Sequence, residues 1–225
     1  MTSINSEQLS EMEKYYRINL INSLSGYKSL NLLATVNKCG ITNLCVVSSV
    51  FHMGSNPPLL GLVIRPEREN NDTLRNIKSV GQYTLNNVLP EWYMQAHQTS
   101  ASYPSGVSEF DECGFKKLYI KKFKVPFVEK STLRIGLELR ETIDVEINGT
   151  TIVIGEIVEV LADDGLIGAD GFVDHVKADT LALAGLDSYY LPQPIGRLAY
   201  AKPGEEPKEL ITETIISLPL TKSKE

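Results

Sequence analysis

Short apolar runs alternate with polar turns along most of the chain, and this pattern predicts a protein built mainly from strands. The early runs follow one another too closely for helical crossovers, so we expect the first strands to form an antiparallel meander, with a loop from His52 to Pro58. The pair Asn148-Gly149 separates two later runs and is typical of a tight hairpin turn. The expected strands are LNLLATVN (30–37), LCVVSSVF (44–51), LLGLVIR (59–65), YTLNNV (83–88), LYIKKFKVPF (118–127), TLRIGLELRETIDVEI (132–147) and TIVIGEIVEVLA (151–162).

Helical periodicity is confined to a few places. Apolar residues recur at helical spacing from Leu9 to Leu24 and predict one helix over 7–24. A second helix is expected in TLRNIKSV (73–80), which Asp72 or Asn71 can cap and which Gly81 ends. Shorter helices are expected within 90–101 and near 176–184.

Many strands with few short helices favour a closed antiparallel barrel, because closure protects the edges of a sheet. The predicted fold class is therefore mainly β, with a few peripheral helices. We expect a single domain over residues 1–225, in which 1–25 form an N-terminal helical extension and 201–225 a C-terminal tail.

Charge and cysteine content narrow the possible partners. The chain has 22 Lys and Arg against 28 Asp and Glu, a net charge of −6. We therefore expect no nucleic acid as main partner, since phosphate-binding surfaces carry a basic surplus. The basic stretch KKLYIKKFK (116–124) is interpreted as an edge strand whose lysines face water.

No apolar run reaches the roughly 20 residues that cross a bilayer, so we expect no membrane association. The N-terminus also lacks the basic and apolar regions of a signal peptide. Cys39, Cys45 and Cys113 have unrelated spacings, as expected of reduced thiols in a cytoplasmic protein.

Familiar catalytic motifs are missing from the sequence. It contains no GxGxxG after a strand, no GxxxxGK, no HExxH and no GxSxG. His52, His97 and His175 are scattered, so no metal centre is expected.

The candidate chemistry lies between residues 43 and 73. Asn43, Ser48 and Ser49 bracket an apolar run with amide and hydroxyl groups, which suit a flat heteroaromatic ring with alternating donors and acceptors. Arg65, Arg68, Asn71 and Thr73 then lead into a helix N-terminus, an arrangement that favours a phosphate. A ring site beside a phosphate site suits flavin mononucleotide (FMN), although such serines and arginines are more often simply solvated.

Three blocks of the sequence resemble, in order and spacing, the flavin reductase-like family of FMN-binding split barrels, and its flavoredoxin-type members most. They are ATVNKCGITNLCVVSSVFHMGSNPPLLGLVIRP, DTLRNIKSVGQYTLN and HQTSASYPSGVSEFD, with GEIVEV and GLDSYY following. The resemblance covers roughly residues 20–200. It implies a homodimeric split β-barrel with FMN at the dimer interface. Members pass hydride from NADH or NADPH to flavin, or shuttle electrons as flavoredoxins.

The resemblance also assigns roles to individual residues. Asn43, with Val46 and Val47, matches the segment that lines the flavin ring and ribityl chain, and Ser48 and Ser49 match its hydroxyl donors.

Arg65 and Thr73 match positions near the phosphate, and the loop from His97 to Ala101, including Ser100, matches one near the flavin. Asp72 departs from the family, which commonly has a basic residue or histidine there. Arg68 is the expected substitute, because an acid at that position repels phosphate unless it turns away.

Hydride transfer between a nicotinamide and a flavin is largely the cofactors' own reaction, so no acid–base pair is required. Candidates for the nicotinamide side are His52, His97, His175, Tyr189 and Tyr190, each also readable as a packed or surface residue. Three functions remain open: an NAD(P)H-dependent FMN oxidoreductase, an electron carrier with tightly bound FMN and protein partners only, and a flavin-storing protein without turnover.

Overall fold

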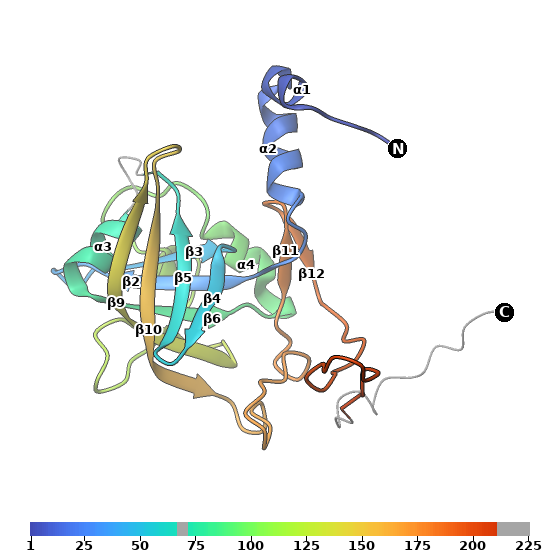
Figure 1. Cartoon of the computed structure of the whole chain (residues 1–225). Coiled ribbons are helices and arrows are strands. Elements are labelled where there is room, and N and C mark those ends of the chain that lie inside the picture. The colour runs from blue at the N-terminus through green and yellow to red at the C-terminus, as the bar shows by residue number, and fades with distance from the viewer. Residues whose placement is uncertain (67–71, 211–225) are drawn as a thin grey trace.

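The computed structural model describes residues 1–66 and 72–210. Its main element is a seven-stranded antiparallel sheet with the strand order β3-β2-β6-β9-β10-β5-β4 (Figure 1). The strands are β2 (Asn31–Val36), β3 (Thr42–Val47), β4 (Val50–Ser55), β5 (Pro58–Ile64), β6 (Gln82–Asn87), β9 (Leu133–Val145) and β10 (Thr150–Ala162). The predicted fold class, a mainly β antiparallel split barrel with few helices, is confirmed.

The sheet is rolled into a barrel, as the short connection between its two edge strands shows. Strands β3 and β4 are the two edges of the sheet, yet only Ser48 and Ser49 separate them in sequence. The Cα atoms of Val47 and Val50 are three residue steps apart and so at most about 11 Å from each other, which brings the two edges together here. The Val63 N–H donates to the Ser49 carbonyl at 3.4 Å beside this junction.

The expected meander is wrong in one respect. The run at 44–51 is not one strand but parts of two, and the expected loop at 52–58 is largely strand β4 followed by a turn at Asn56-Pro57. Strand β3 pairs with β2 and β4 pairs with β5, so β3 and β5 are not neighbours. Apolar periodicity does not report the break, because small serines interrupt the run without a glycine or proline.

Two apolar clusters form the core, one on each face of β2. Leu32, Ala34 and Val36 belong to the outer cluster, and Leu33 points into the barrel. This alternation follows from the two-residue period of a strand. Inside the barrel, Tyr83 of β6 reaches Gly155 of β10, where a Cβ would lie 2.8 Å from the Tyr83 Cζ.

Helix α3 (Asp72–Val80) is confirmed and closes one end of the barrel. Its Leu74 and Ile77 are buried in the inner cluster. The outer cluster is covered by a short 3-10 helix (Pro90–Trp92), α4 (Tyr93–Gln98) and α5 (Glu109–Glu112). The helix expected within 90–101 is thus present as two short pieces.

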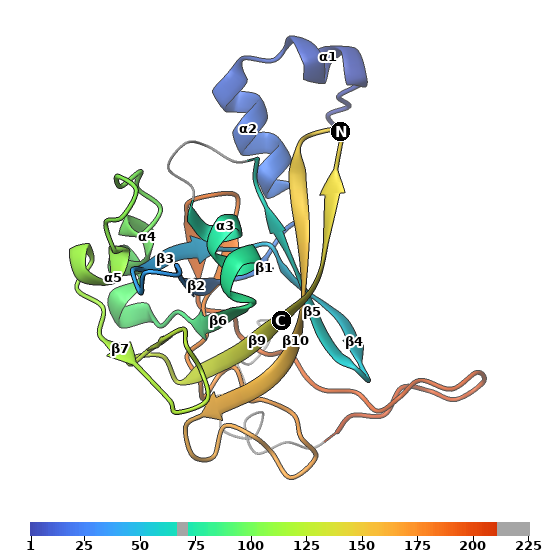
Figure 2. The ribbon, with the colours of Figure 1, turned by 90° about the vertical axis from the view of Figure 1, so that its left-hand side faces the viewer.

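The N-terminal extension is two helices rather than the single one expected over 7–24. Helix α1 (Ser6–Glu11) ends before Glu13, whose carboxylate accepts hydrogen bonds from the N–H groups of Tyr15 and Tyr16 and caps α2 (Lys14–Ser23). Neither helix buries a residue. Figures 1 and 2 show them projecting from the barrel.

The basic stretch 116–124 is not the edge strand that the sequence suggested. Only β7 (Lys117–Leu118) is extended there, paired with β8 (Phe127–Val128). Phe123 is buried in the outer cluster and Lys117 pairs with Asp111 at 2.8 Å. The segment alternates as a strand does because Phe123 and its neighbours pack against the core from a series of turns.

A second sheet has three short strands in the order β1 (Lys28–Ser29), β11 (Ala182–Ala184) and β12 (Ser188–Tyr190). The helix expected near 176–184 is therefore wrong, since turns and β11 occupy that range. Residues 191–210 then run as an extended arm (Figure 2), in which the Ala199 N–H donates to the Lys208 carbonyl. Part of the expected tail, 211–225, lies outside the described residues.

Candidate functional site

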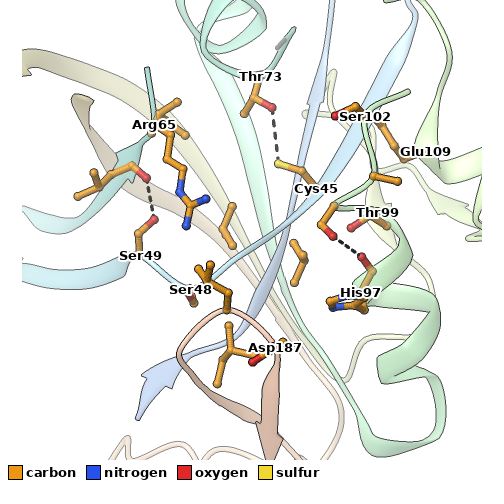
Figure 3. Close-up of a pocket in the computed structure, with 18 of the residues that line it drawn as sticks. Cys45, Ser48, Ser49, Arg65, Thr73, His97, Thr99, Ser102, Glu109 and Asp187 are labelled. Atoms are coloured by element: carbon orange, nitrogen blue, oxygen red, sulfur yellow. Dashed lines mark hydrogen bonds between the residues drawn. The ribbon is translucent and has the colours of Figure 1, made fainter. Parts of the chain in front are cut away.

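An open cleft of about 810 Å³ lies where the two edges of the barrel meet. The β3–β4 junction, the end of β5, the first turn of α3, the segment 97–103 and the β11–β12 hairpin line it (Figure 3). Every predicted site residue that the structure describes borders this cleft: Asn43, Val46, Val47, Ser48, Ser49, Arg65, Thr73, His97, Ser100 and Ala101. Arg68 and Asn71 lie outside the described residues.

The two junction serines differ in what they offer. The Ser49 hydroxyl donates to the Val63 carbonyl at 2.7 Å, which ties the ends of β4 and β5 together. The Ser48 side chain has no hydrogen bond to a described residue and lies at the centre of the cleft in Figure 3. Ser48 is therefore the hydroxyl that can bind a ligand, and Ser49 holds the barrel edge in place.

Arg65 supplies a cation at one end of the cleft. It follows the last residue of β5, is exposed, and points into the cleft toward Ser48 (Figure 3). Its guanidinium forms no ion pair or hydrogen bond with any residue in 1–66 or 72–210. A guanidinium beside the start of α3 is suited to a bidentate oxyanion such as phosphate.

Asp72, the acid that departs from the family pattern, has its own partners. Its carboxylate pairs with Arg75 one turn later and accepts a hydrogen bond from the Ser105 hydroxyl at 3.2 Å. The neighbouring guanidinium offsets its negative charge. The repulsion between Asp72 and a phosphate, which the sequence led us to expect, is thereby reduced.

Asn43 and Thr73 belong to a hydrogen-bonded network in the floor of the cleft. The Asn43 amide donates to the Glu109 carboxylate at 2.9 Å, and its carbonyl accepts from the Thr73 hydroxyl at 3.0 Å. Both side chains are thus directed at protein groups, and they hold β3, α3 and α5 together. Their expected direct contacts with a flavin stay predictions.

Glu109 is the part of this network that the sequence did not reveal. Its carboxylate is only 8% exposed and also accepts the Leu44 N–H at 2.9 Å. Burial raises the pKa of the Glu109 carboxyl, while the hydrogen bonds from Leu44 and Asn43 oppose that rise. Glu109 lies 66 positions from Asn43, so no local pattern could have paired the two.

The raised pKa of the Glu109 carboxyl predicts how its contribution to stability changes with pH. A carboxyl whose pKa is higher in the folded chain holds a proton there that the unfolded chain has released, so its contribution to stability falls as pH rises through the interval between the two pKa values. Glu109→Gln keeps an oxygen acceptor and removes the charge. We expect the variant to be at least as stable as wild type at pH 7 and to lose its advantage at pH 4. Urea unfolding of the variant and of wild type at both pH values checks this. A variant that is less stable than wild type at pH 7, with a larger deficit there than at pH 4, contradicts the expectation.

The opposite rim of the cleft contains an aromatic group. The His97 Nδ1 and the Tyr189 hydroxyl are 2.7 Å apart, and the Tyr189 ring also packs on Tyr93 at 5.2 Å. Burial raises the pKa of Tyr189 to about 12, so it is neutral at physiological pH. The Ser100 hydroxyl is turned back to the His97 carbonyl at 2.7 Å.

Of the five candidates for the nicotinamide side, His97 and Tyr189 border the cleft. The other three lie elsewhere: His52 is on β4, the ring of His175 bonds to Thr180, and Tyr190 packs on Tyr27. Cleft residues that the sequence did not single out include Lys28, Ser102 and Asp187. They come from segments whose polar residues are indistinguishable from solvated ones until the fold brings them together.

The described part of the chain contains no group of three side chains able to hold a metal ion. The three cysteines form no disulfide, and burial raises the pKa of the Cys45 thiol to about 11. No helix within 1–66 or 72–210 has the length and apolarity needed to cross a bilayer.

Known proteins with a similar sequence or structure share this fold. The flavin reductase like domain family matches residues 24–176. A split-barrel protein of the flavin reductase type from Shewanella frigidimarina is 46% identical, with a TM-score of 0.86 over 89% of this chain and 100% of that chain.

Two further solved structures have the same fold at lower identity. The 2-nitrobenzoate 2-nitroreductase of Pseudomonas fluorescens has a TM-score of 0.76 and 22% identity over 91% of this chain and 99% of its own. The flavoredoxin of Desulfovibrio vulgaris has a TM-score of 0.65 and 22% identity over 80% and 92%. The family match includes the barrel and most of the cleft, and the chain belongs to the flavin reductase-like family of split-barrel proteins.

Proposed function

We propose that this protein is an FMN-dependent oxidoreductase that accepts hydride from NADH or NADPH and passes the electrons to flavin or to a downstream acceptor. The observation that carries the proposal is the guanidinium of Arg65, which points into the cleft and has no ion-pair or hydrogen-bond partner within 1–66 or 72–210. A guanidinium in this position can hold an anionic group through charge-assisted hydrogen bonds.

The cleft fits a flavin mononucleotide in both size and chemistry. Its volume of about 810 Å³ lies within the usual range for cofactor sites, roughly 300–1,000 Å³. One end has the cation for a single phosphate. The lining of the β3–β4 junction consists of valines, serines and their backbone groups, which suit a neutral heteroaromatic ring.

Each group of residues has a distinct task in this proposal. Arg65 and the N–H groups at the start of α3 bind the phosphate, and Ser48 binds the polar edge of the ring or the ribityl chain. Asn43, Thr73 and Glu109 fix β3 against α3 and α5, so the junction keeps its shape. Bound flavin supplies the hydride chemistry, and the protein orients the two rings and limits the access of water.

Anaerobic titration with NADH and NADPH tests this activity. We expect one of the two nucleotides to bleach the flavin absorbance of the purified protein within seconds. A flavin that neither nucleotide reduces, but that a protein reductase does, indicates instead an electron carrier of the flavoredoxin kind. The likeness to the Desulfovibrio flavoredoxin supports keeping that alternative.

We also propose a homodimer. Helices α1 and α2 bury no residue, and Tyr15, Tyr16, Ile21 and Leu24 are exposed on α2 and directly after it. Helices of this length are marginal in water without a partner surface. A second copy of the chain is the partner that the family resemblance favours.

Light scattering of the FMN-loaded protein at micromolar concentration is expected to give twice the chain mass of 24.9 kDa. Removing residues 1–25 is expected to weaken the dimer. A monomer mass for the intact chain contradicts the proposal.

A further inference from the structure

One wall of the cleft is built largely from residues outside the segment that matches the family. The match ends at residue 176, whereas β11 and β12 span 182–190. Their hairpin contributes Leu183, Leu186, Asp187 and Tyr189 to the cleft. This hairpin therefore lines the same cleft as the residues assigned to the flavin, where a second ligand could meet it.

Lys28 anchors this wall. It lies on β1, which pairs with β11, and its ammonium donates to the Gly185 carbonyl at 3.1 Å and the Asn22 carbonyl at 3.0 Å. These two bonds tie the hairpin and the end of α2 to β1. An ammonium has three N–H donors, so one remains for another acceptor.

No acidic side chain among the described residues pairs with the charge of Lys28. Lys28 is half-buried and borders the cleft, yet it forms no salt bridge with any residue the structure describes. A positive charge partly removed from water favours an anion nearby. Arg65 stands on a different wall, at the end of β5, and is already assigned to the flavin phosphate.

We propose that Lys28 binds the anionic group, a phosphate or a carboxylate, of the second substrate that meets the flavin in this cleft. The inference rests on the proposed function, because it places the electron donor or acceptor beside the flavin. The His97–Tyr189 pair on the same rim offers polar hydrogen-bonding atoms for the rest of that substrate.

Asp187 allows a second test, because its charge is opposite to that of Lys28. Its carboxylate is on the same hairpin and borders the cleft, with the Ser188 hydroxyl as donor at 3.4 Å. A carboxylate near an anion weakens its binding. Removing the Lys28 charge and removing the Asp187 charge should therefore act in opposite directions on one and the same anionic ligand.

Calorimetric binding to the FMN-loaded protein tests the proposal with four unreactive probes: NAD⁺, NADP⁺, benzoate and its neutral analogue benzamide. Lys28→Gln removes the charge but keeps an N–H donor for the Gly185 carbonyl, and Lys28→Arg keeps the charge. We expect the Gln variant to weaken at least one anionic probe about tenfold and the Arg variant to retain most affinity. Asp187→Asn is expected to strengthen the same probe about twofold.

Lys38→Gln is the matched control, since it removes the same charge from an exposed lysine beyond the other end of β2. A loss confined to the two nucleotides identifies a phosphate as the anion, and a loss confined to benzoate identifies a carboxylate. Equal losses for benzamide and benzoate, no loss for any anion, or no binding of any probe to wild type would overturn the proposal. The FMN affinity of each variant is measured in parallel. A protein that binds FMN normally while Lys28→Gln changes nothing contradicts the assignment of Lys28 alone, whereas failure to bind FMN contradicts the proposed function.

Discussion

Replacing Arg65 with alanine is expected to weaken FMN binding about ten- to a hundredfold, because a charge-assisted hydrogen bond contributes roughly 1.5–3 kcal/mol. The guanidinium points into the cleft and has no ion-pair partner among residues 1–66 and 72–210, so its loss leaves no other protein charge uncompensated. The change should therefore appear in ligand affinity and not in stability.

Riboflavin provides the internal reference for this variant. It has the same ring and ribityl chain but lacks the phosphate, so its affinity should be nearly the same in Arg65→Ala and wild type. Arg140→Ala is the control protein, because Arg140 carries the same charge on β9 and pairs there with Glu138 and Glu156. Equal losses for FMN and riboflavin, or no loss for either, would show that Arg65 does not hold the phosphate.

Replacing Gly155 with alanine is expected to destabilise the barrel by about 2–3 kcal/mol, the cost of inserting a methyl group into a packed core. The added Cβ would overlap the hydroxyl of Tyr83 and lie 3.1 Å from the Leu137 Cδ2. Tyr83 is 1% exposed, and Leu137 is fully buried, so neither side chain can move without disturbing the inner cluster.

The Tyr83 hydroxyl makes this prediction more specific. Among the buried side-chain nitrogen and oxygen atoms of the described residues, it is the one that has no hydrogen-bond partner. Tyr83→Phe should therefore cost little, or stabilise the fold, and it removes the atom that the new methyl group would strike first. We expect Gly155→Ala to be less damaging in the Tyr83→Phe background than in wild type. Urea unfolding of the two single variants and the double variant measures this coupling, and strict additivity would contradict the contact.

The sequence was informative wherever a feature is local. The Asn148-Gly149 hairpin is present, with β9 and β10 paired along their length, and α3 begins at Asp72 and ends before Gly81. The predicted site residues also meet in one cleft, because most of them lie on consecutive elements between β3 and α3.

Features that depend on contacts between residues far apart in the chain could not be predicted from the sequence. The rolling of the sheet is set by which strands pair, and apolar periodicity does not specify partners. Glu109 under β3 and the Lys28 bond to Gly185 both join residues far apart in the chain. The range near 176–184 reads as helix in sequence, but it begins with turns, and β1 and β12 supply the hydrogen bonds that make Ala182–Ala184 a strand.

The identity of the bound cofactor tests the account most directly. Freshly purified protein, or protein incubated with FMN and passed through a desalting column, should be yellow. Denaturation should release FMN and not FAD, in a ratio near one per chain, as chromatography of the released flavin can establish. A colourless protein that takes up neither FMN nor FAD would contradict the assignment of this cleft to a flavin.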